Sequence, residues 1–290
     1  MSGHDELTEK LRKLGPQFNP AILAATRELY RAPVEGTAWA KLQAIENVAY
    51  GAAERQVLDV YPTERPNAPI LLFVHGGGFV GGDKNGDGVF YGNVGRYFAH
   101  HGFLSVCMNY RLAPASTWPA GSDDVATALA WVVEHGAGYG GDADKIVVIG
   151  QSAGAAHVAS VIFDDRFSLP TGVRAAALLS GFYEARTGLQ AGPQLYFGED
   201  ERAWPDRSAT SHVKPGHIPL LLCVAEFDPA QIAEQTLILA QALNKVDGFP
   251  PRLVWLENQN HVSAVHGFGL GEDAPGSMLR SFFESALPRP

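Results

Sequence analysis

The stretch from Lys145 to Ser160 reads KIVVIGQSAGAAHVAS, and it contains an apolar strand, a tight turn and a helical segment in that order. A side chain at the apex of such a turn is exposed, and here the apex is Ser152. The small residues Gly150 and Gly154 let the strand and the helix approach each other closely. The stretch therefore predicts a nucleophilic serine at the end of a buried strand.

Apolar runs flank this unit on both sides, and helical stretches separate the later ones. Most of the later runs are continuously apolar, which is typical of parallel strands buried on both faces of a sheet. The expected strands are Glu46–Tyr50, Val57–Tyr61, Ile70–His75, Leu104–Asn109, Lys145–Gly150, Ala175–Leu179, Leu220–Ala225 and Arg252–Leu256, and the expected helices are Asn19–Tyr30, Asp123–Glu134, Ala153–Phe163 and Ala230–Asn244. The alternation predicts a three-layer α/β fold, with a mostly parallel eight-stranded sheet and helices on both faces. Ligands then belong at the carboxyl ends of the strands.

We expect a single domain, residues 1–290, because α/β sheets of this length often form one unit. Residues 181–219 interrupt the alternation with aromatic residues, Pro and Gly in no clean period, and they are too long for an ordinary connection. We expect them to form a small inserted cap. Residues 1–44 precede the first strands and include a helical pattern, so they can act as a second cap element or pack against the sheet.

Charge and cysteine usage exclude several classes of protein. The chain has 22 Lys and Arg against 31 Asp and Glu, a net charge of −9, and it carries no basic run suited to nucleic acid. Because no apolar stretch approaches the roughly 20 residues of a membrane span and the charged start lacks a signal-peptide core, we expect a cytoplasmic protein without a membrane partner. Cys107 and Cys223 lie inside apolar runs without ligand-type neighbours, so we expect no metal site.

A serine hydroxyl is a weak nucleophile, and it needs a histidine to take its proton and a carboxylate to orient that histidine. In a sheet of this kind both partners belong on loops after later strands, in the chain order Ser, Asp, His. Asp228 stands beyond a strand end and before Pro229, at a helix start from which its side chain can turn inward. It is our candidate acid, and Glu226 is the rival.

Two histidines compete for the role of base. His261 lies five residues past the end of the last expected strand, and His266 lies further on in the tripeptide HGF. Loop reach favours His261, whereas His266 then belongs to the rim of a pocket or to the core.

The third apolar run, ILLFVH, leads into three glycines at positions 76–78. Acyl transfer places negative charge on the former carbonyl oxygen, so the site needs preorganised donors aimed at that oxygen. We predict the backbone amides of Gly77, Gly78 and Ala153 as these oxyanion-hole donors, and we assign His75 a bracing role in the loop. A phosphate-binding loop is disfavoured because no GK[ST] follows.

Aromatic residues of the loops and the expected insert are candidates for pocket walls, although each can equally belong to the core. They are Phe79, Tyr110, Trp118, Phe182, Tyr183, Tyr196 and Phe197. A pocket of modest size favours acyl chains of about two to eight carbons. Neither step of such an acyl transfer needs a metal or an organic cofactor.

Six motifs extend over nearly the whole chain: HGGGF at 75–79, NYRLAP at 109–114, WPAGSDDV at 118–125, GQSAG at 150–154, AEFDP at 225–229 and NHVS at 260–263. Together they resemble the hormone-sensitive-lipase-like carboxylesterases of the α/β-hydrolase superfamily. The resemblance implies an ester substrate and an N-terminal helical cap over the pocket. For the site it implies the triad Ser152, Asp228 and His261, with Gly77, Gly78 and Ala153 as the oxyanion hole. A homodimer, formed through an edge strand or a helix, is common in that family.

Two positions depart from the family pattern. Gln151 stands where the family more often has Asp or Glu, and the HGF of its lipase-like members begins here at His266. The NHVS form and the short cap also look like bacterial kynurenine formamidases, so an N-formyl amide substrate stays open beside a short- to medium-chain ester. A non-catalytic binding protein on the same fold is disfavoured, because all three triad residues are available.

Overall fold

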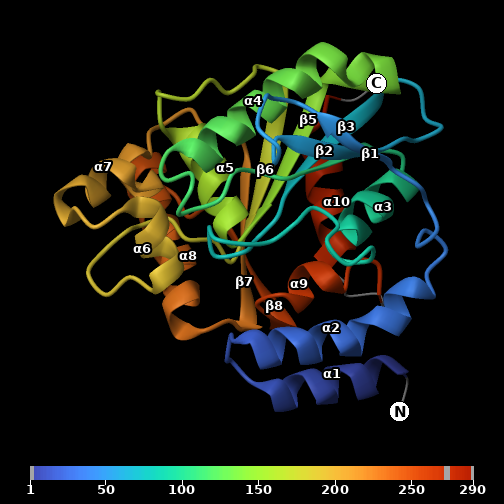
Figure 1. The fold of residues 1–290 in the computed structure, drawn as a ribbon, viewed down its shortest axis with the longest axis horizontal. Helices are drawn as coiled ribbons and strands as arrows, with labels where there is room; N and C mark the ends of the chain where they lie inside the picture. The colour runs from blue at the N-terminus through green and yellow to red at the C-terminus, as the bar shows by residue number, and fades with distance from the viewer. Residues whose placement is uncertain (1–2, 271–274, 289–290) are drawn as a thin grey trace.

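A twisted sheet of eight strands runs through the centre of the molecule (Figure 1). The computed structural model describes residues 3–270 and 275–288; the remaining residues of the expected 1–290 domain, including residues 1–2 of the expected cap segment 1–44, lie outside the described residues. The strands are β1 (Ile45–Ala49), β2 (Val57–Tyr61), β3 (Ala68–Val74), β4 (Leu104–Met108), β5 (Gly141–Gln151), β6 (Val173–Leu179), β7 (Leu220–Phe227) and β8 (Arg252–Asn260).

The strand order is β1-β2-β4-β3-β5-β6-β7-β8. Strand β2 is antiparallel to both of its neighbours, and the six strands from β4 to β8 in this order are parallel. The expected α/β fold class, with a mostly parallel eight-stranded sheet, is therefore confirmed.

Helices cover both faces of the sheet. On one side lie α4 (Ala120–His135), α5 (Ala153–Phe163) and α8 (Ala230–Asp247), and on the other lie α3 (Gly92–His100) and α10 (Pro275–Ala286) (Figure 1). The remaining helical elements are α1 (Gly3–Leu14), α2 (Pro20–Glu35), η1 (Gly136–Tyr139), α6 (Ala191–Phe197), η2 (Glu201–Ala203), α7 (Trp204–Arg207), η3 (Ala209–His212) and α9 (Ser263–His266).

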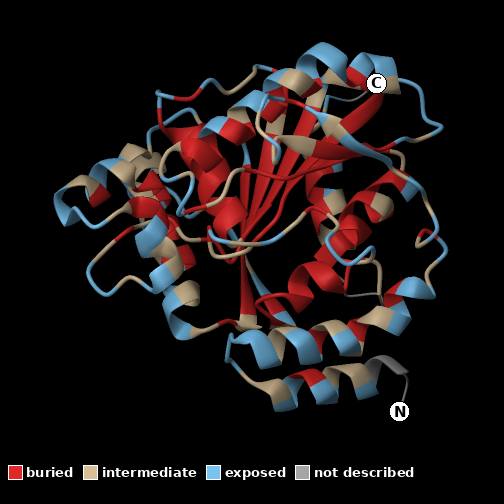
Figure 2. Cartoon of the chain, viewed as in Figure 1, coloured by how far each residue is buried: buried red, intermediate tan, exposed pale blue. Residues whose placement is uncertain are grey.

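Alternating side chains of the buried strands build two separate cores. On β3, Ile70, Leu72 and Val74 pack with α4 and α5, whereas Leu71 and Phe73 pack with α3 and α10. Successive side chains of a strand point to opposite faces, so a continuously apolar run is what a sheet covered on both faces requires. Figure 2 shows the result as a buried sheet inside a shell of half-exposed helices.

The N-terminal helices lie side by side across one end of the sheet, near β8 and α9 (Figure 1). Helix α2 begins where the Asn-Pro pair indicated, because the Asn19 side chain accepts hydrogen bonds from the backbone N–H groups of Ala21 and Ile22. Helix α1 was not predicted, nor were α3 and α10. In α1 the apolar stripe is only Leu7, Leu11 and Leu14 among charged residues, so its period is weak in the sequence.

Residues 181–219 carry four short helical elements, α6, η2, α7 and η3, at one side of the molecule (Figure 1). They connect β6 to β7, two adjacent parallel strands. Among the described residues, none of the helices is long and apolar enough to cross a membrane.

Candidate active site

Ser152 occupies a strained turn between β5 and α5. Its backbone has φ 53° and ψ −120°, a combination that non-glycine residues rarely adopt. The turn is tight because a Cβ atom at Gly154 would lie 2.2 Å from the Val74 carbonyl oxygen, and one at Gly150 would lie 2.6 Å from the Cα of Ala155. The two flanking glycines are therefore required by space, as expected from the sequence.

His261 and Asp228 reach this serine from two later loops. Asp228 directly follows β7 and His261 directly follows β8, so both lie at the carboxyl edge of the sheet. The Nε2 atom of His261 is 2.9 Å from the Ser152 Oγ, and its Nδ1 is 2.8 Å from Asp228 Oδ1. Both side chains are almost fully buried. The structure thus brings the three predicted residues into one hydrogen-bonded chain.

The two rival residues lie elsewhere. Glu226 accepts a hydrogen bond from the backbone N–H of Asn258 at 2.6 Å, and it links the ends of β7 and β8. His266 is fully buried, with its ring stacked on Phe90 at 4.2 Å, and neither ring nitrogen has a hydrogen-bond partner in the structure. Burial, helped by the positive charge of Arg27, lowers the pKa of His266 to about 3, so this ring is neutral near pH 7.

The predicted oxyanion loop follows β3. Gly78 and Ala153 line the same cavity as Ser152, while Gly77 does not line it. Gly77 has φ 148° and Gly78 has φ 61°, conformations that favour glycine. The side chain of His75 braces the loop, because its Nδ1–H donates a hydrogen bond to the Gly76 carbonyl at 2.7 Å. Burial lowers the pKa of His75 to about 4, which suits a neutral bracing role.

A cavity of about 320 Å³ opens above Ser152. Of the seven aromatic residues predicted as pocket walls, Phe79 and Phe182 line it. The other five do not: Tyr110, Tyr183, Tyr196 and Phe197 are buried in the core, and the ring of Trp118 contacts the guanidinium groups of Arg166 and Arg207, at 4.6 and 5.5 Å. Tyr196 and Phe197 still shape the cavity indirectly, since both pack against the ring of Phe79.

Several cavity residues were missed in the sequence. Phe18, just before α2, packs edge-on against the His261 ring, with a centroid distance of 4.7 Å. Arg186 comes from the insert, Gln231 from the first turn of α8, and Ser180 from the end of β6. Only Ser180 had a usable signal, because it ends an apolar run at the carboxyl edge, where ligands are expected.

Gln151, the departure from the family pattern, is hydrogen-bonded to the backbone of His261. Its Nε2 donates to the carbonyl oxygen of His261 at 3.0 Å, and its Oε1 lies 3.4 Å from the hydroxyl of Tyr91, which donates to it. The side chain is almost completely buried. A neutral amide therefore holds the His261 loop without placing a charge beside Ser152.

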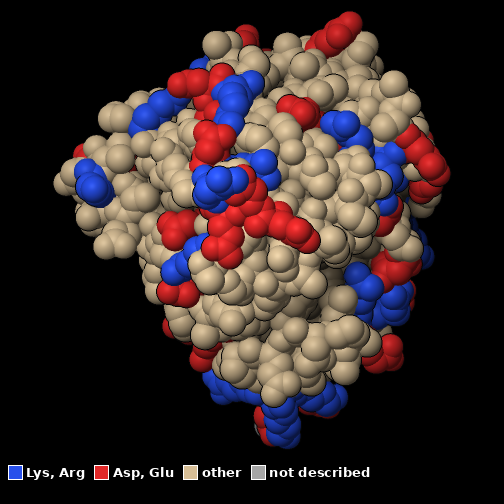
Figure 3. All heavy atoms as spheres, turned by 60° about the vertical axis from the view of Figure 1, so that its left-hand side comes forward, with Lys and Arg blue, Asp and Glu red and all other residues tan. Residues whose placement is uncertain are grey.

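Charges are mixed on the face that carries the insert. Figure 3 shows basic and acidic side chains gathered together there, with an uncharged tract beneath them. Within residues 3–270 and 275–288, no three His, Cys, Asp or Glu side chains are grouped so that they could hold a metal ion.

A mostly parallel sheet of this order, with a serine on a strained strand-to-helix turn, defines the α/β-hydrolase class. Residues 119–275, more than half of the chain, match the model of the prolyl oligopeptidase family, and the chain belongs to that family. Residues 58–163 also match a family model described as BD-FAE.

A protein of Mycobacterium tuberculosis named "Probable carboxylic ester hydrolase LipM" is 31% identical over 221 residues, which cover 73% of this chain and 46% of the relative. "Esterase LipI" of the same organism is 34% identical over 146 residues, which cover 49% of this chain and 43% of the relative. The chain thus spans less than half the length of these relatives. The predicted resemblance to α/β-hydrolase esterases is confirmed.

Among solved structures, "Bacterial Heroin Esterase" superposes with a TM-score of 0.71 at 23% identity and covers 98% of both chains. Esterase B from Lactobacillus rhamnosis superposes with a TM-score of 0.74 at 20% identity, covering 99% of this chain and 96% of its own. At such identities the likeness concerns the fold.

Proposed function

We propose that this protein is a serine carboxylesterase that hydrolyses short- to medium-chain carboxylic esters through an acyl-enzyme intermediate. The observation that carries the proposal is the chain of contacts from Ser152, which lines a cavity, through His261 to Asp228, with distances of 2.9 and 2.8 Å. The relatives' names, carboxylic ester hydrolase and esterase, support the same reaction class.

In the proposed reaction, His261 accepts the proton of Ser152 while the serine oxygen attacks the ester carbonyl. Asp228 stabilises the imidazolium that forms. His261 then gives the proton to the departing alcohol, and Ser152 carries the acyl group. Water, activated by the same histidine, attacks the acyl-enzyme and releases the acid.

The negative oxygen of each tetrahedral intermediate needs donors in place beforehand. We assign the amides of Gly77, Gly78 and Ala153 to this role. Ala153 is the first residue of α5, where backbone N–H groups have no partner inside the helix, and the helix dipole also favours negative charge there. The lining of the cavity by Gly78 and Ala153 supports two of the three assignments.

The size and walls of the cavity support the substrate class. A space of about 320 Å³ is at the lower end of the range for small-molecule pockets. We infer that residues 1–44 and 181–219 act as its cap within a single domain. Phe18 covers His261 from the first segment, and Phe182, Arg186 and Leu189 form part of the wall from the second.

The proposal is tested by comparing hydrolysis of p-nitrophenyl butyrate with that of N-formylkynurenine, which a formamidase prefers. We expect kcat/KM for the butyrate ester to be higher by at least about tenfold, with activity falling again for long acyl chains. Equal or faster turnover of the formamide would replace the esterase assignment with an arylformamidase.

A further inference from the structure

Ser180 lines the cavity and contacts Asp228, although it belongs neither to the strand-to-helix turn nor to the predicted acid and base. Ser180 directly follows β6, the strand between β5 and β7. The preceding residue, Leu179, accepts a hydrogen bond from the backbone N–H of Ser152 at 2.9 Å. The end of β6 is therefore attached directly to the turn that carries Ser152.

The hydroxyl group of Ser180 donates a hydrogen bond of 2.6 Å to Asp228 Oδ2. The same oxygen accepts a bond of 2.8 Å from the backbone N–H of Ala225, while the other oxygen, Oδ1, faces His261. Ser180 and Asp228 are 1% and 5% exposed, so the carboxylate depends on protein donors in place of water.

The backbone places this hydroxyl at a conformational cost. Ser180 has φ 47°, a left-handed conformation that is uncommon for residues other than glycine. Its N–H donates to the Cys223 carbonyl of β7 at 2.9 Å, which fixes the turn against the strand that leads to Asp228. A glycine would meet the backbone requirement more easily, but it would supply no hydroxyl.

We propose that Ser180 is a positioning residue for the reaction, acting through Asp228, and this inference rests on the proposed function. Its donor fixes the rotation of the carboxylate, so that Oδ1 stays aimed at His261 Nδ1. It also stabilises the negative charge that Asp228 must keep while the imidazolium forms beside it. No covalent step involves Ser180.

The first test replaces Ser180 with Ala and with Gly, and measures kcat and KM for p-nitrophenyl butyrate. A hydrogen bond to a buried charge is lost in both variants, so kcat falls about 10- to 100-fold while KM changes little. Ser180→Cys keeps a weak donor and gives an intermediate kcat. Ser160→Ala, which removes a buried hydroxyl bonded only to the α5 backbone at Ala156, leaves kcat unchanged.

The second test is a double-mutant cycle with Asp228→Ala, read out as the rate of labelling by a fluorophosphonate. If Ser180 acts through the carboxylate, Ser180→Ala slows labelling in the wild-type background and has almost no effect once Asp228 is gone. Thermal unfolding of each variant shows that the labelling rates refer to folded protein.

An equal slowing in both backgrounds, or a Ser180→Ala variant with wild-type kcat, would overturn the inference. Neither outcome would contradict the proposed function. The proposed function is contradicted if the wild-type protein is not labelled, or if labelling persists in Ser152→Ala.

Discussion

His261 and His266 are both buried and only five residues apart, yet their surroundings are opposite. His261 is hydrogen-bonded through both ring nitrogens, to Ser152 and to Asp228. The ring of His266 stacks on Phe90 with no hydrogen bond to either nitrogen, and it stays neutral because burial lowers its pKa to about 3. A general base must be within hydrogen-bond reach of the proton that it takes, and His261 meets this condition.

Replacing each histidine separately tests this distinction. We expect His261→Ala to lower kcat for p-nitrophenyl butyrate by about 10³-fold or more, since the serine loses its base. His266→Leu places an apolar side chain of similar size against Phe90, and this variant should retain kcat within a few-fold. Loss of turnover only in the variant at position 266, with both proteins folded, would make that residue the base.

At the residue scale, the sequence was most informative where chemistry and strand ends coincide. Ser152, Asp228 and His261 could all be placed at the carboxyl edge from apolar runs and loop lengths. The cavity walls could not, because the ring that a loop aromatic packs against depends on tertiary contacts. Tyr110 shows this: it is fully buried and stacks on His75, although its position in the sequence suggested a wall.

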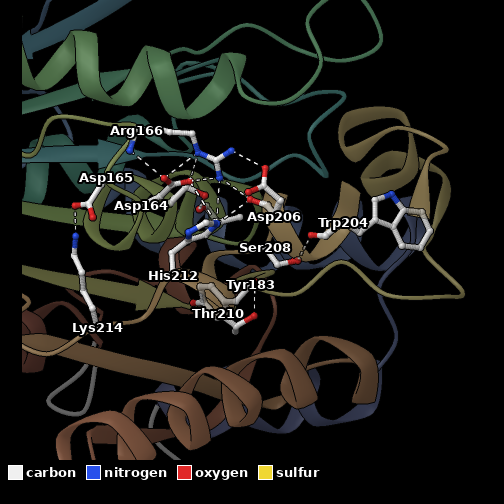
Figure 4. Close-up of polar contacts among 12 residues, drawn as sticks. Asp164, Asp165, Arg166, Tyr183, Trp204, Asp206, Ser208, Thr210, His212 and Lys214 are labelled. Carbon is white, nitrogen blue, oxygen red and sulfur yellow. Dashed lines mark hydrogen bonds and ion pairs between the residues drawn. The ribbon is translucent and has the colours of Figure 1, made fainter. Parts of the chain in front are cut away.

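Arg166 is one of several residues that link residues 181–219 to the rest of the protein (Figure 4). Arg166, just after α5, pairs with the buried Asp164 and also with Asp206 of α7, and its Nη2 lies 3.1 Å from the Nε2 of His212 in η3. Its guanidinium also lies over the Trp118 ring at 4.6 Å. Burial alone would raise the pKa of Asp164, but the hydrogen bonds from Arg166 outweigh it and keep that pKa below its usual value.

We therefore expect Arg166→Met to lower the free energy of unfolding by about 1–3 kcal/mol, because Asp164 would remain buried without its main donor. The matched control is Arg202→Met in the same insert. Among the described residues Arg202 pairs with Asp200, and both side chains are exposed, so its replacement should cost much less stability than Arg166→Met. Urea unfolding of the two variants provides the comparison, and equal losses would contradict this role for Arg166.

The elements differ in how far the sequence could reveal them. Strand β2 and helix α5 have the predicted bounds, because their apolar patterns are clear and flanked by turn residues. Helix α3 was missed because Gly92 and Gly95 weaken its helical signal, although both are buried. Gly95 is required by packing, since a Cβ there would lie 2.5 Å from the Tyr61 ring.

On the scale of the whole molecule, burial keeps His75, His157 and His266 neutral near pH 7. Burial lowers their pKa values to about 4, 3 and 3, respectively, from the usual value of 6.5. Below pH 6.5 these histidines bind protons in the unfolded chain but stay unprotonated in the folded protein. The free energy of unfolding therefore falls as the pH decreases toward these pKa values. Each histidine contributes roughly 1 kcal/mol for each pH unit in this window.

The variant His266→Leu should therefore show a shallower loss of unfolding free energy between pH 6 and pH 4.5 than the wild type, by roughly 1 kcal/mol per pH unit. His135→Gln is the control, because the side chain of His135 is exposed and its replacement should leave the slope unchanged. Parallel pH profiles for wild type and His266→Leu would show that this burial does not control acid stability.

The overall fold could be predicted because two patterns in the sequence determine how the sheet is built. Continuous apolar runs predict strands covered on both faces, and strand-helix alternation predicts parallel neighbours. The placement of the N-terminal segment and of residues 181–219 did not follow, since it depends on particular tertiary contacts such as those of Phe18 with His261 and of Arg166 with Asp206. The central claim concerns Ser152, which the fold places on the turn between β5 and α5.

That claim is tested most directly by treating the protein with a fluorophosphonate and locating the adduct by mass spectrometry. We predict one adduct per chain on the peptide that contains Ser152, and none in Ser152→Ala. An unlabelled wild-type protein, or an adduct on another residue, would contradict the assignment of Ser152 as the nucleophile.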